Sequence, residues 1–245
     1  MPELGIRKNQ FIEDCLKCHG GGNYYDYSHK IHVRNLAKTH NINLLGSGSE
    51  SVVFEDPKTN KVIAFKHRNC YTPQQAKQLF YLHKIAHTLF PNNFPILHAA
   101  FGKDPSKPYH ISGTIREKVD GRPLQLDGGH YSLFLELSIR TKLWLRRKFS
   151  KYPTFEDIHK ECEKWDLPLM YRLDKYEGNF LYTREGKVYY VDMLDDRLTN
   201  HELSTLDNIL DYMKAKNYSK NDQESVGSAI CRLKTIVQQS KQVAV

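Results

Sequence analysis

The chain has 245 residues, of which 40% are hydrophobic and 26% are charged, as in an ordinary globular protein. We expect neither a transmembrane segment nor a signal peptide, because no stretch approaches the roughly 18 consecutive apolar residues of a membrane helix and no basic region precedes an apolar core at the N-terminus. The five scattered cysteines favour free thiols over a disulfide framework, and the net charge of +8 favours acidic or phosphorylated partners.

The first forty residues predict an irregular N-terminal extension, with a glycine-rich stretch at Gly20–Asn23. Four residues in this segment have the order C-x2-C-x10-H-x2-H, which is close to but outside the usual zinc-finger spacing: Cys15, Cys18, His29 and His32. We favour a flexible extension with incidental cysteines, and a structural zinc is the alternative.

The next part of the chain predicts a β-rich region. A hairpin is expected from 43 to 66, with its turn at Asp56–Asn60. Thr72 and Pro73 suit the first positions of a helix that Pro91 ends. Two further strands are predicted around 96–101 and 109–118.

After the linker 120–124 the chain predicts mainly helices. These are expected at 131–149, at 154–165 with a capping box of Thr154 and Asp157, at 203–214 and at 223–240. A short strand pair should flank Glu185 and Gly186. The whole pattern predicts an α+β fold with an N-terminal extension (1–40), a β-rich lobe (41–119) and a helical lobe (120–245).

A glycine–serine loop lies between two predicted strands at Gly46–Val53. It fits the pattern G-x-G-x-x-S-x-V, in which small residues let the backbone approach phosphates closely. The candidate nucleotide-binding residues here are Gly46, Ser47, Gly48, Ser49, Ser51 and Val53. A plain hairpin turn is the alternative for this loop taken alone.

Lys66 ends the next, otherwise apolar strand. A lysine at this position favours contact with an anion, and a lysine that faces solvent from an edge strand is the alternative.

Three polar residues follow further along the chain in the pattern D-x-x-x-x-N, apolar hairpin, Asp. Asp174 and Asn179 precede one short strand, and Asp192 ends the next. A carboxylate such as Asp174 can orient an acceptor hydroxyl and take its proton, while the oxygens of Asn179 and Asp192 suit Mg²⁺.

These pieces, in this order and spacing, resemble the protein-kinase-like superfamily over about residues 41–209. The resemblance implies a bilobal fold, ATP and Mg²⁺ as cofactors, phosphate contacts from Lys66, a catalytic base at Asp174, and metal ligands at Asn179 and Asp192. It also implies a hinge at Glu117 and Val119 and an adenine pocket lined by Val53, Ala64 and Leu181.

The sequence departs from the family at several positions. Met193 and Leu194 follow Asp192 in place of Phe-Gly, and only a short activation segment fits before the predicted helix at 203. The helix after Lys66 has no acidic residue where the family has its glutamate. We expect Gln75, Gln78 or Glu50 to partner Lys66 instead.

These departures make the chain similar to compact kinases such as RIO-type kinases, lipopolysaccharide and aminoglycoside phosphotransferases, and bacterial effector kinases. The resemblance implies transfer of the ATP γ-phosphate to a hydroxyl, with Ser/Thr of a protein favoured. Alternatives are a sugar, aminoglycoside or lipid headgroup as acceptor, a nucleotide-binding pseudokinase, and transfer of AMP.

The basic segment 140–151 predicts an amphipathic helix with a solvated face, and docking of an acidic partner is the sharper alternative. We expect a cytoplasmic protein, with delivery to a host cell as a secreted effector the alternative.

Overall fold

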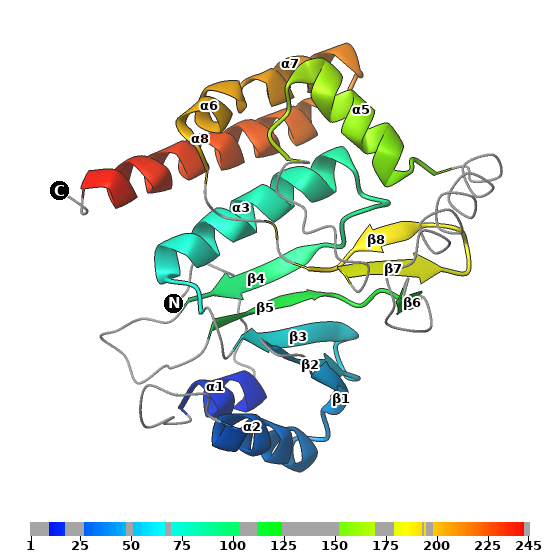
Figure 1. Cartoon of the computed structure of the whole chain (residues 1–245), viewed down its shortest axis with the longest axis vertical. Coiled ribbons are helices and arrows are strands. Elements are labelled where there is room, and N and C mark those ends of the chain that lie inside the picture. The colour runs from blue at the N-terminus through cyan, green and yellow to red at the C-terminus, as the bar shows by residue number, and fades with distance from the viewer. Residues whose placement is uncertain are drawn as a thin grey trace, which may run out of the picture. The chain divides into compact units, whose positions relative to one another are not determined.

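A computed structural model describes residues 10–17, 27–47, 51–66, 70–102, 112–123, 152–169, 179–192, 194 and 198–242. This part of the chain has an α+β fold (Figure 1) with the elements α1 (Gln10–Lys17), α2 (Tyr27–Thr39), β1 (Asn43–Ser47), β2 (Ser51–Asp56), β3 (Lys61–Lys66), α3 (Pro73–Leu89), β4 (Leu97–Phe101), β5 (Ser112–Glu117), β6 (Gly121–Pro123), α5 (Phe155–Trp165), β7 (Phe180–Thr183), β8 (Val188–Tyr190), α6 (Asn200–Thr205), α7 (Asn208–Ala215) and α8 (Lys220–Gln242).

The chain divides into two compact units, which are described separately. Unit 1 comprises Met1–Lys84, Ile96–Lys118 and Ala229–Val245, and unit 2 comprises Ile85–Pro95 and Val119–Ser228. Within the described residues, no helix combines the length and the apolar character needed to span a membrane.

Unit 1 is built on a five-stranded antiparallel sheet with the order β1-β2-β3-β5-β4. β2 and β3 form the predicted hairpin, and its turn is closed by Asp56, whose carboxylate accepts hydrogen bonds from Lys58 N (3.0 Å) and Thr59 Oγ1 (2.8 Å). The glycine–serine segment joins β1 to β2. The strands predicted near 96–101 and 109–118 are confirmed as β4 and β5, although residues 103–111 lie outside the described part.

One face of this sheet is covered by the N-terminal helices (Figure 1). Alternate residues of β2 and β3 are buried, as the two-residue period of a strand requires, and Phe54 and Phe65 point to the covered face. The Phe11 ring on α1 lies 5.5 Å from the Phe54 ring and 5.8 Å from the Phe65 ring, both edge-on. α1 and α2 are therefore part of the hydrophobic core of unit 1.

This packing corrects the expectation of irregular structure over the first forty residues, where α1 and α2 form two helices. Phe11, Ile12 and Cys15 are buried and fall on one side of α1 at helical spacing. In the middle of α1 the Asp14 carboxylate pairs with His40 Nε2 at 2.9 Å, which ties α1 to the residue after α2.

The helix predicted after Thr72 is confirmed as α3. Thr72 and Gln75 form a reciprocal cap, in which Gln75 Oε1 accepts from Thr72 N (2.8 Å) and Thr72 Oγ1 accepts from Gln75 N (3.2 Å). Gly102, after β4, packs against the start of α3, because a Cβ at Gly102 would lie 2.2 Å from the Thr72 carbonyl carbon. The start of α3 is thus fixed from two sides.

α3 also carries a buried histidine. Burial and, to a smaller extent, the nearby Arg116 of β5 lower the pKa of His83 from 6.5 to about 3. Below pH 6.5 the unfolded chain therefore takes up a proton that the folded chain does not, so His83 lowers the free energy of unfolding as the pH falls. Between pH 7 and pH 5 this loss should reach about 2 kcal/mol.

Urea unfolding at pH 7 and pH 5 tests this expectation. In His83→Gln the free energy of unfolding should fall much less between pH 7 and pH 5 than in the wild type. His159→Gln, which changes a partly exposed histidine of α5, should show the same decrease as the wild type. Equal pH sensitivity in wild type and His83→Gln would contradict it.

Unit 2 contains a three-stranded antiparallel sheet with the order β6-β7-β8. β7 and β8 are the strand pair predicted around Glu185 and Gly186, and Gly186 has the positive φ (89°) that the turn requires. Tyr190, the last residue of β8, is fully buried. Its ring centre lies 5.3 Å from that of Phe180 and 6.1 Å from that of Phe94.

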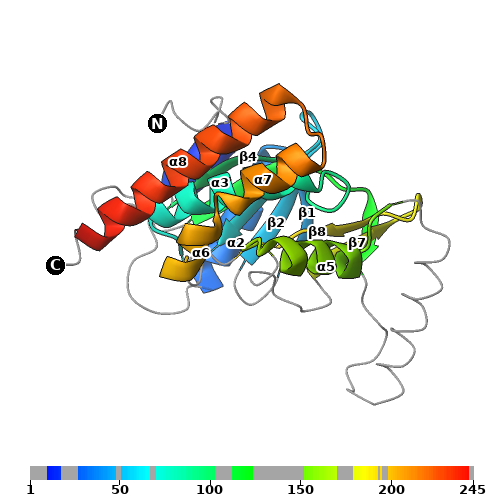
Figure 2. The same ribbon diagram turned by 90° about the horizontal axis from the view of Figure 1, so that it is seen from above.

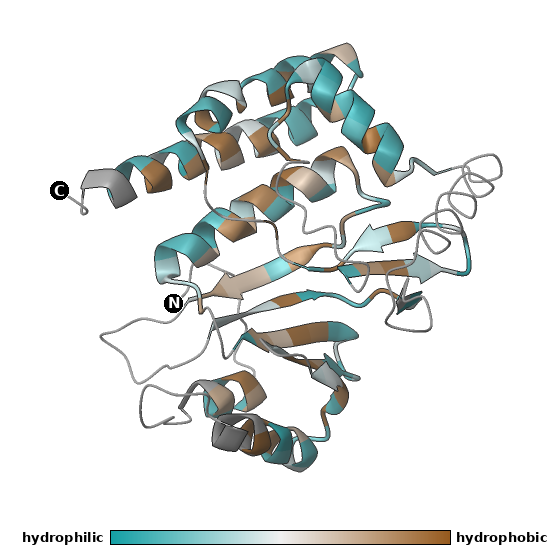
Figure 3. Ribbon diagram, in the orientation of Figure 1, coloured by the Kyte–Doolittle hydropathy of each residue, from teal (hydrophilic) through white to brown (hydrophobic). Residues whose placement is uncertain are grey.

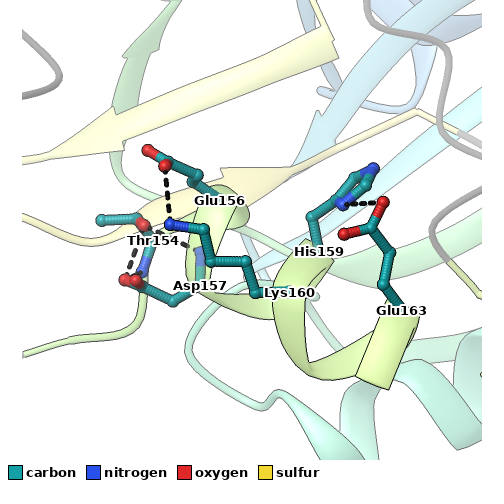
Figure 4. Close-up of polar contacts among 6 residues, drawn as sticks. All are labelled: Thr154, Glu156, Asp157, His159, Lys160 and Glu163. Atoms are coloured by element: carbon teal, nitrogen blue, oxygen red, sulfur yellow. Dashed lines mark hydrogen bonds and ion pairs between the residues drawn. The ribbon is translucent and has the colours of Figure 1, made fainter. Parts of the chain in front are cut away.

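α5 begins at the predicted capping box (Figure 4). The Thr154 hydroxyl accepts from Asp157 N (3.2 Å), and the Asp157 carboxylate accepts from Thr154 N (2.9 Å). Lys160 pairs with Glu156 one turn away at 3.0 Å on the exposed side of the helix. Local sequence therefore specifies this helix from its first turn.

The predicted helix 203–214 is wrong in one respect, because two helices, α6 and α7, occupy this region (Figure 2). α6 starts earlier, at a capping box of Thr199 and Glu202. At the junction, Ile209 N bonds Leu206 O and Leu210 N bonds Asp207 O, three residues back, which tightens the turn and separates the helices.

The last predicted helix is confirmed as α8, along which hydrophobic and hydrophilic residues alternate (Figure 3). Its buried residues recur at helical spacing: Val226, Ala229, Ile230, Leu233 and Val237. Within unit 1, Arg232 Nη1 of α8 donates a hydrogen bond to Tyr81 Oη of α3 (3.1 Å).

Candidate functional site

In unit 1 the sheet register places several predicted nucleotide-binding residues on the open face, opposite α1 and α2. Ser51 of β2 pairs with Lys66 of β3, and Val53 pairs with Ala64. Directly paired residues of antiparallel strands point to the same side, and residues two apart share a face. These four side chains therefore share one face, and each is partly exposed.

β1 and β5 extend these rows on either side. Gly46 of β1 pairs with Val53, and a Cβ at Gly46 would meet no atom within 4 Å. Thr114 of β5 pairs with Ala64, and Ser112 pairs with Lys66. Ser47 pairs with Val52, so it points to the other side of the sheet, and it is exposed. Ser112 and Thr114 are buried, so only the β1, β2 and β3 part of these rows is partly exposed.

The structure gives Lys66 a partner that the sequence did not predict. Lys66 Nζ donates a hydrogen bond to Tyr71 Oη at 3.1 Å and lies 4.7 Å from the centre of the Tyr71 ring. Gln75 uses its side-chain oxygen to cap α3. Gln78 is buried on α3, and Glu50 lies outside the described residues, so these two partners stay predictions.

In unit 2 the β7–β8 hairpin brings the two predicted metal ligands to the same end of one small sheet. Phe180 pairs with Tyr190, so Asn179 lies opposite Val191, and Val191 N donates a hydrogen bond to Asn179 O at 2.8 Å. Asp192 is the next residue, where the chain bends, and the side chains of Asn179 and Asp192 are both partly exposed.

A buried asparagine supports this end of the hairpin. Asn93, in the segment after α3, is 1% exposed, and its Nδ2 donates hydrogen bonds to Pro153 O (3.0 Å) and Val188 O (3.2 Å). Its backbone oxygen accepts from Tyr190 N at 2.8 Å. β8 is therefore held two residues before Asp192, and no motif in the sequence identified Asn93.

The segment predicted as a hinge follows β5. Glu117 ends β5 with an exposed side chain, and its backbone N bonds Ile96 O at 2.9 Å. Val119 begins the part of the chain that belongs to unit 2, and its carbonyl accepts from Gly121 N at 3.0 Å. A Cβ at Gly121 would lie 2.9 Å from the Cβ of Leu181, so β6 packs closely against the predicted adenine-pocket residue Leu181.

Other predictions lie outside the described residues. Among them are the catalytic base Asp174, the loop residues Gly48 and Ser49, and the basic segment 140–151. Of the four possible zinc ligands, Cys15 is buried in the apolar core of unit 1, while the side chains of Cys18, His29 and His32 are not described. The four described cysteines are free thiols, as expected: Cys15, Cys70, Cys162 and Cys231.

Comparison with known proteins adds no family assignment: no model of a known protein family matches the chain, and a search of curated proteins gives no match.

Proposed function

We propose that the chain is an atypical kinase that transfers the γ-phosphate of ATP to a hydroxyl, with Ser/Thr of a protein as the favoured acceptor. The observation that carries this proposal is the register of the β7–β8 hairpin, which sets Asn179 and Asp192 at the same end of one sheet. One carboxylate and one amide oxygen fit Mg²⁺, a hard ion that keeps several waters and binds substrate phosphates as well.

In this proposal the predicted residues have the roles that the resemblance implies. Lys66 of unit 1 would contact the phosphates, and Val53 and Ala64 would pack against the adenine. In unit 2, Asn179 and Asp192 would hold Mg²⁺, which neutralises charge on the transferred phosphoryl group when bound. Asp174 would orient the acceptor hydroxyl and take its proton.

The order of elements supports a kinase-like bilobal fold as part of the same proposal. β1, β2 and β3 are followed by α3 and then by β4 and β5, and these five strands form one antiparallel sheet. β5 leads directly into unit 2. The described residues after β6 are mainly helical.

A nucleotide-binding pseudokinase is the second candidate, and the lack of an acidic residue in α3 favours it. The family pairs the lysine that corresponds to Lys66 with a glutamate of the corresponding helix. If that glutamate is required for turnover, the site would bind nucleotide without transferring phosphate.

Labelled ATP separates these functions. The protein is incubated with Mg²⁺ and either γ-labelled or α-labelled ATP, with casein and myelin basic protein as generic protein acceptors and aminoglycosides and sugars as small ones. Transfer of γ-label that Lys66→Met abolishes supports a kinase, and the acceptor labelled identifies its class. Lys61→Met, at the other end of β3, is the matched control and should keep activity.

Other outcomes would contradict the kinase proposal. Incorporation of α-label would indicate AMP transfer. Nucleotide binding without any turnover would indicate a pseudokinase, and no nucleotide binding would overturn both candidates.

A further inference from the structure

Tyr71 contacts Lys66 through two parts of its side chain. The hydroxyl accepts a hydrogen bond from Lys66 Nζ at 3.1 Å, and the ring centre lies 4.7 Å from the same nitrogen, within the range of a cation–π contact. The ammonium therefore lies near the hydroxyl end of the ring. Both contacts restrict the directions that the flexible lysine side chain can take.

The backbone of Tyr71 is fixed by its neighbours. Tyr71 N donates a hydrogen bond to Ser112 Oγ at 2.9 Å, and Ser112 is fully buried. Ser112 also pairs with Lys66 across the β3–β5 ladder, so one residue anchors both partners. The capped start of α3 follows at Thr72, against Gly102. The backbone of Tyr71 is thus anchored to β5 and directly precedes the capped start of α3.

A phenol differs from a carboxylate in what it does to the lysine. A carboxylate at hydrogen-bonding distance orients the ammonium and also cancels its charge. The hydroxyl and ring of Tyr71 are neutral, so they orient the ammonium without placing a negative charge beside it. This contact therefore orients Lys66 without weakening its attraction for phosphate oxygens.

We propose that Tyr71 is a positioning residue that holds Lys66 for the phosphate groups of a nucleotide, a role that rests on the proposed function. Its substrate class is a nucleoside di- or triphosphate, because the orientation matters only to a ligand whose phosphates reach the end of β3. Tyr71 should therefore affect the affinity for ADP and leave the affinity for adenosine unchanged.

Two measurements on the full chain test this role. First, the ¹H–¹³C resonance of the Lys66 side chain, assigned with Lys66→Arg, reports ring contact without any nucleotide. It should move in Tyr71→Leu, which removes ring and hydroxyl, and change less in Tyr71→Phe, which keeps the ring. Second, calorimetry gives the Kd for ADP and for adenosine. Tyr71→Leu should raise the Kd for ADP about three- to tenfold, with Tyr71→Phe between it and wild type.

Tyr81→Leu is the matched control, because Tyr81 of α3 also contacts a cation, the Arg232 guanidinium. It should leave the Lys66 resonance and both Kd values unchanged. Suppose that Tyr71→Leu moves the Lys66 resonance but leaves the Kd for ADP at the wild-type value, while Lys66→Met raises the Kd for ADP. The positioning role is then overturned and the proposed function stands. If wild type binds no ADP, both are overturned.

Discussion

Replacing Asp192, the proposed Mg²⁺ ligand, by asparagine should lower the proposed phosphate transfer by roughly a hundredfold or more, because the loss of a metal carboxylate removes several kcal/mol of transition-state stabilisation. The substitution keeps the size of the side chain and removes its charge. Since Asp192 is partly exposed and follows a well-anchored strand, the fold should not change. The loss should therefore appear in kcat at saturating Mg²⁺ and ATP.

The measurement is the transfer rate of γ-label, with thermal unfolding recorded alongside it. Asp211→Asn, on an exposed carboxylate of α7 in the same unit, is the matched control and should stay within about twofold of wild type. An active Asp192→Asn protein with unchanged dependence on Mg²⁺ would contradict the assignment of Asp192 as a metal ligand.

Replacing Phe11 by alanine should destabilise unit 1 by about 3–5 kcal/mol, the usual cost of removing a large buried aromatic side chain. Phe11 is 1% exposed and lies edge-on to Phe54 and Phe65. Phe65 directly precedes Lys66 on β3, so loss of this packing should also disturb the strand that carries the proposed phosphate contact.

Urea unfolding gives this cost. Phe54→Ala, in the same cluster, should cost a similar amount, whereas Ile31→Ala, on an α2 residue that is 44% exposed, should cost less than about 1 kcal/mol. If Phe11→Ala is as stable as Ile31→Ala while Phe54→Ala is strongly destabilised, α1 is not part of the core.

Elements with strong local signals were predictable from the sequence. α5 has its capping box at Thr154, and α3 has Thr72 and Pro73 at its start and a proline after its end. The two hairpins follow from turn residues between apolar strands. In each case the decisive interactions lie within a few residues, so a local pattern contains them.

α1 shows why the N-terminal helices were missed. It has eight residues, and isolated helices shorter than about 12–15 residues are marginal in water, so its stability comes from packing on the sheet. The glycine-rich segment between α1 and α2 favoured a prediction of irregular structure, so the helical spacing of Phe11, Ile12 and Cys15 was not used. The start of α6 was different, because its capping box, Thr199 and Glu202, stands in the sequence and could have been used.

Part of the candidate site was also predictable from the sequence, and part was not. Asn179 and Asp192 flank an apolar hairpin at a spacing that predicts their positions at one end of it. Tyr71 could not be predicted as the partner of Lys66, because the contact depends on the path of the chain between β3 and α3 and on the anchor at Ser112. Neither leaves a periodic pattern in the sequence.

The most direct test of the proposed metal site is paramagnetic broadening by Mn²⁺, used in place of Mg²⁺, in the presence of ATP. The side-chain amide resonances of Asn179 should broaden beyond detection at a small fraction of an equivalent of Mn²⁺, and Asp192→Asn should strongly reduce this broadening. If ATP and Mn²⁺ bind while the Asn179 amide stays sharp, the end of the β7–β8 hairpin is not the metal site and the kinase proposal loses the observation that carries it.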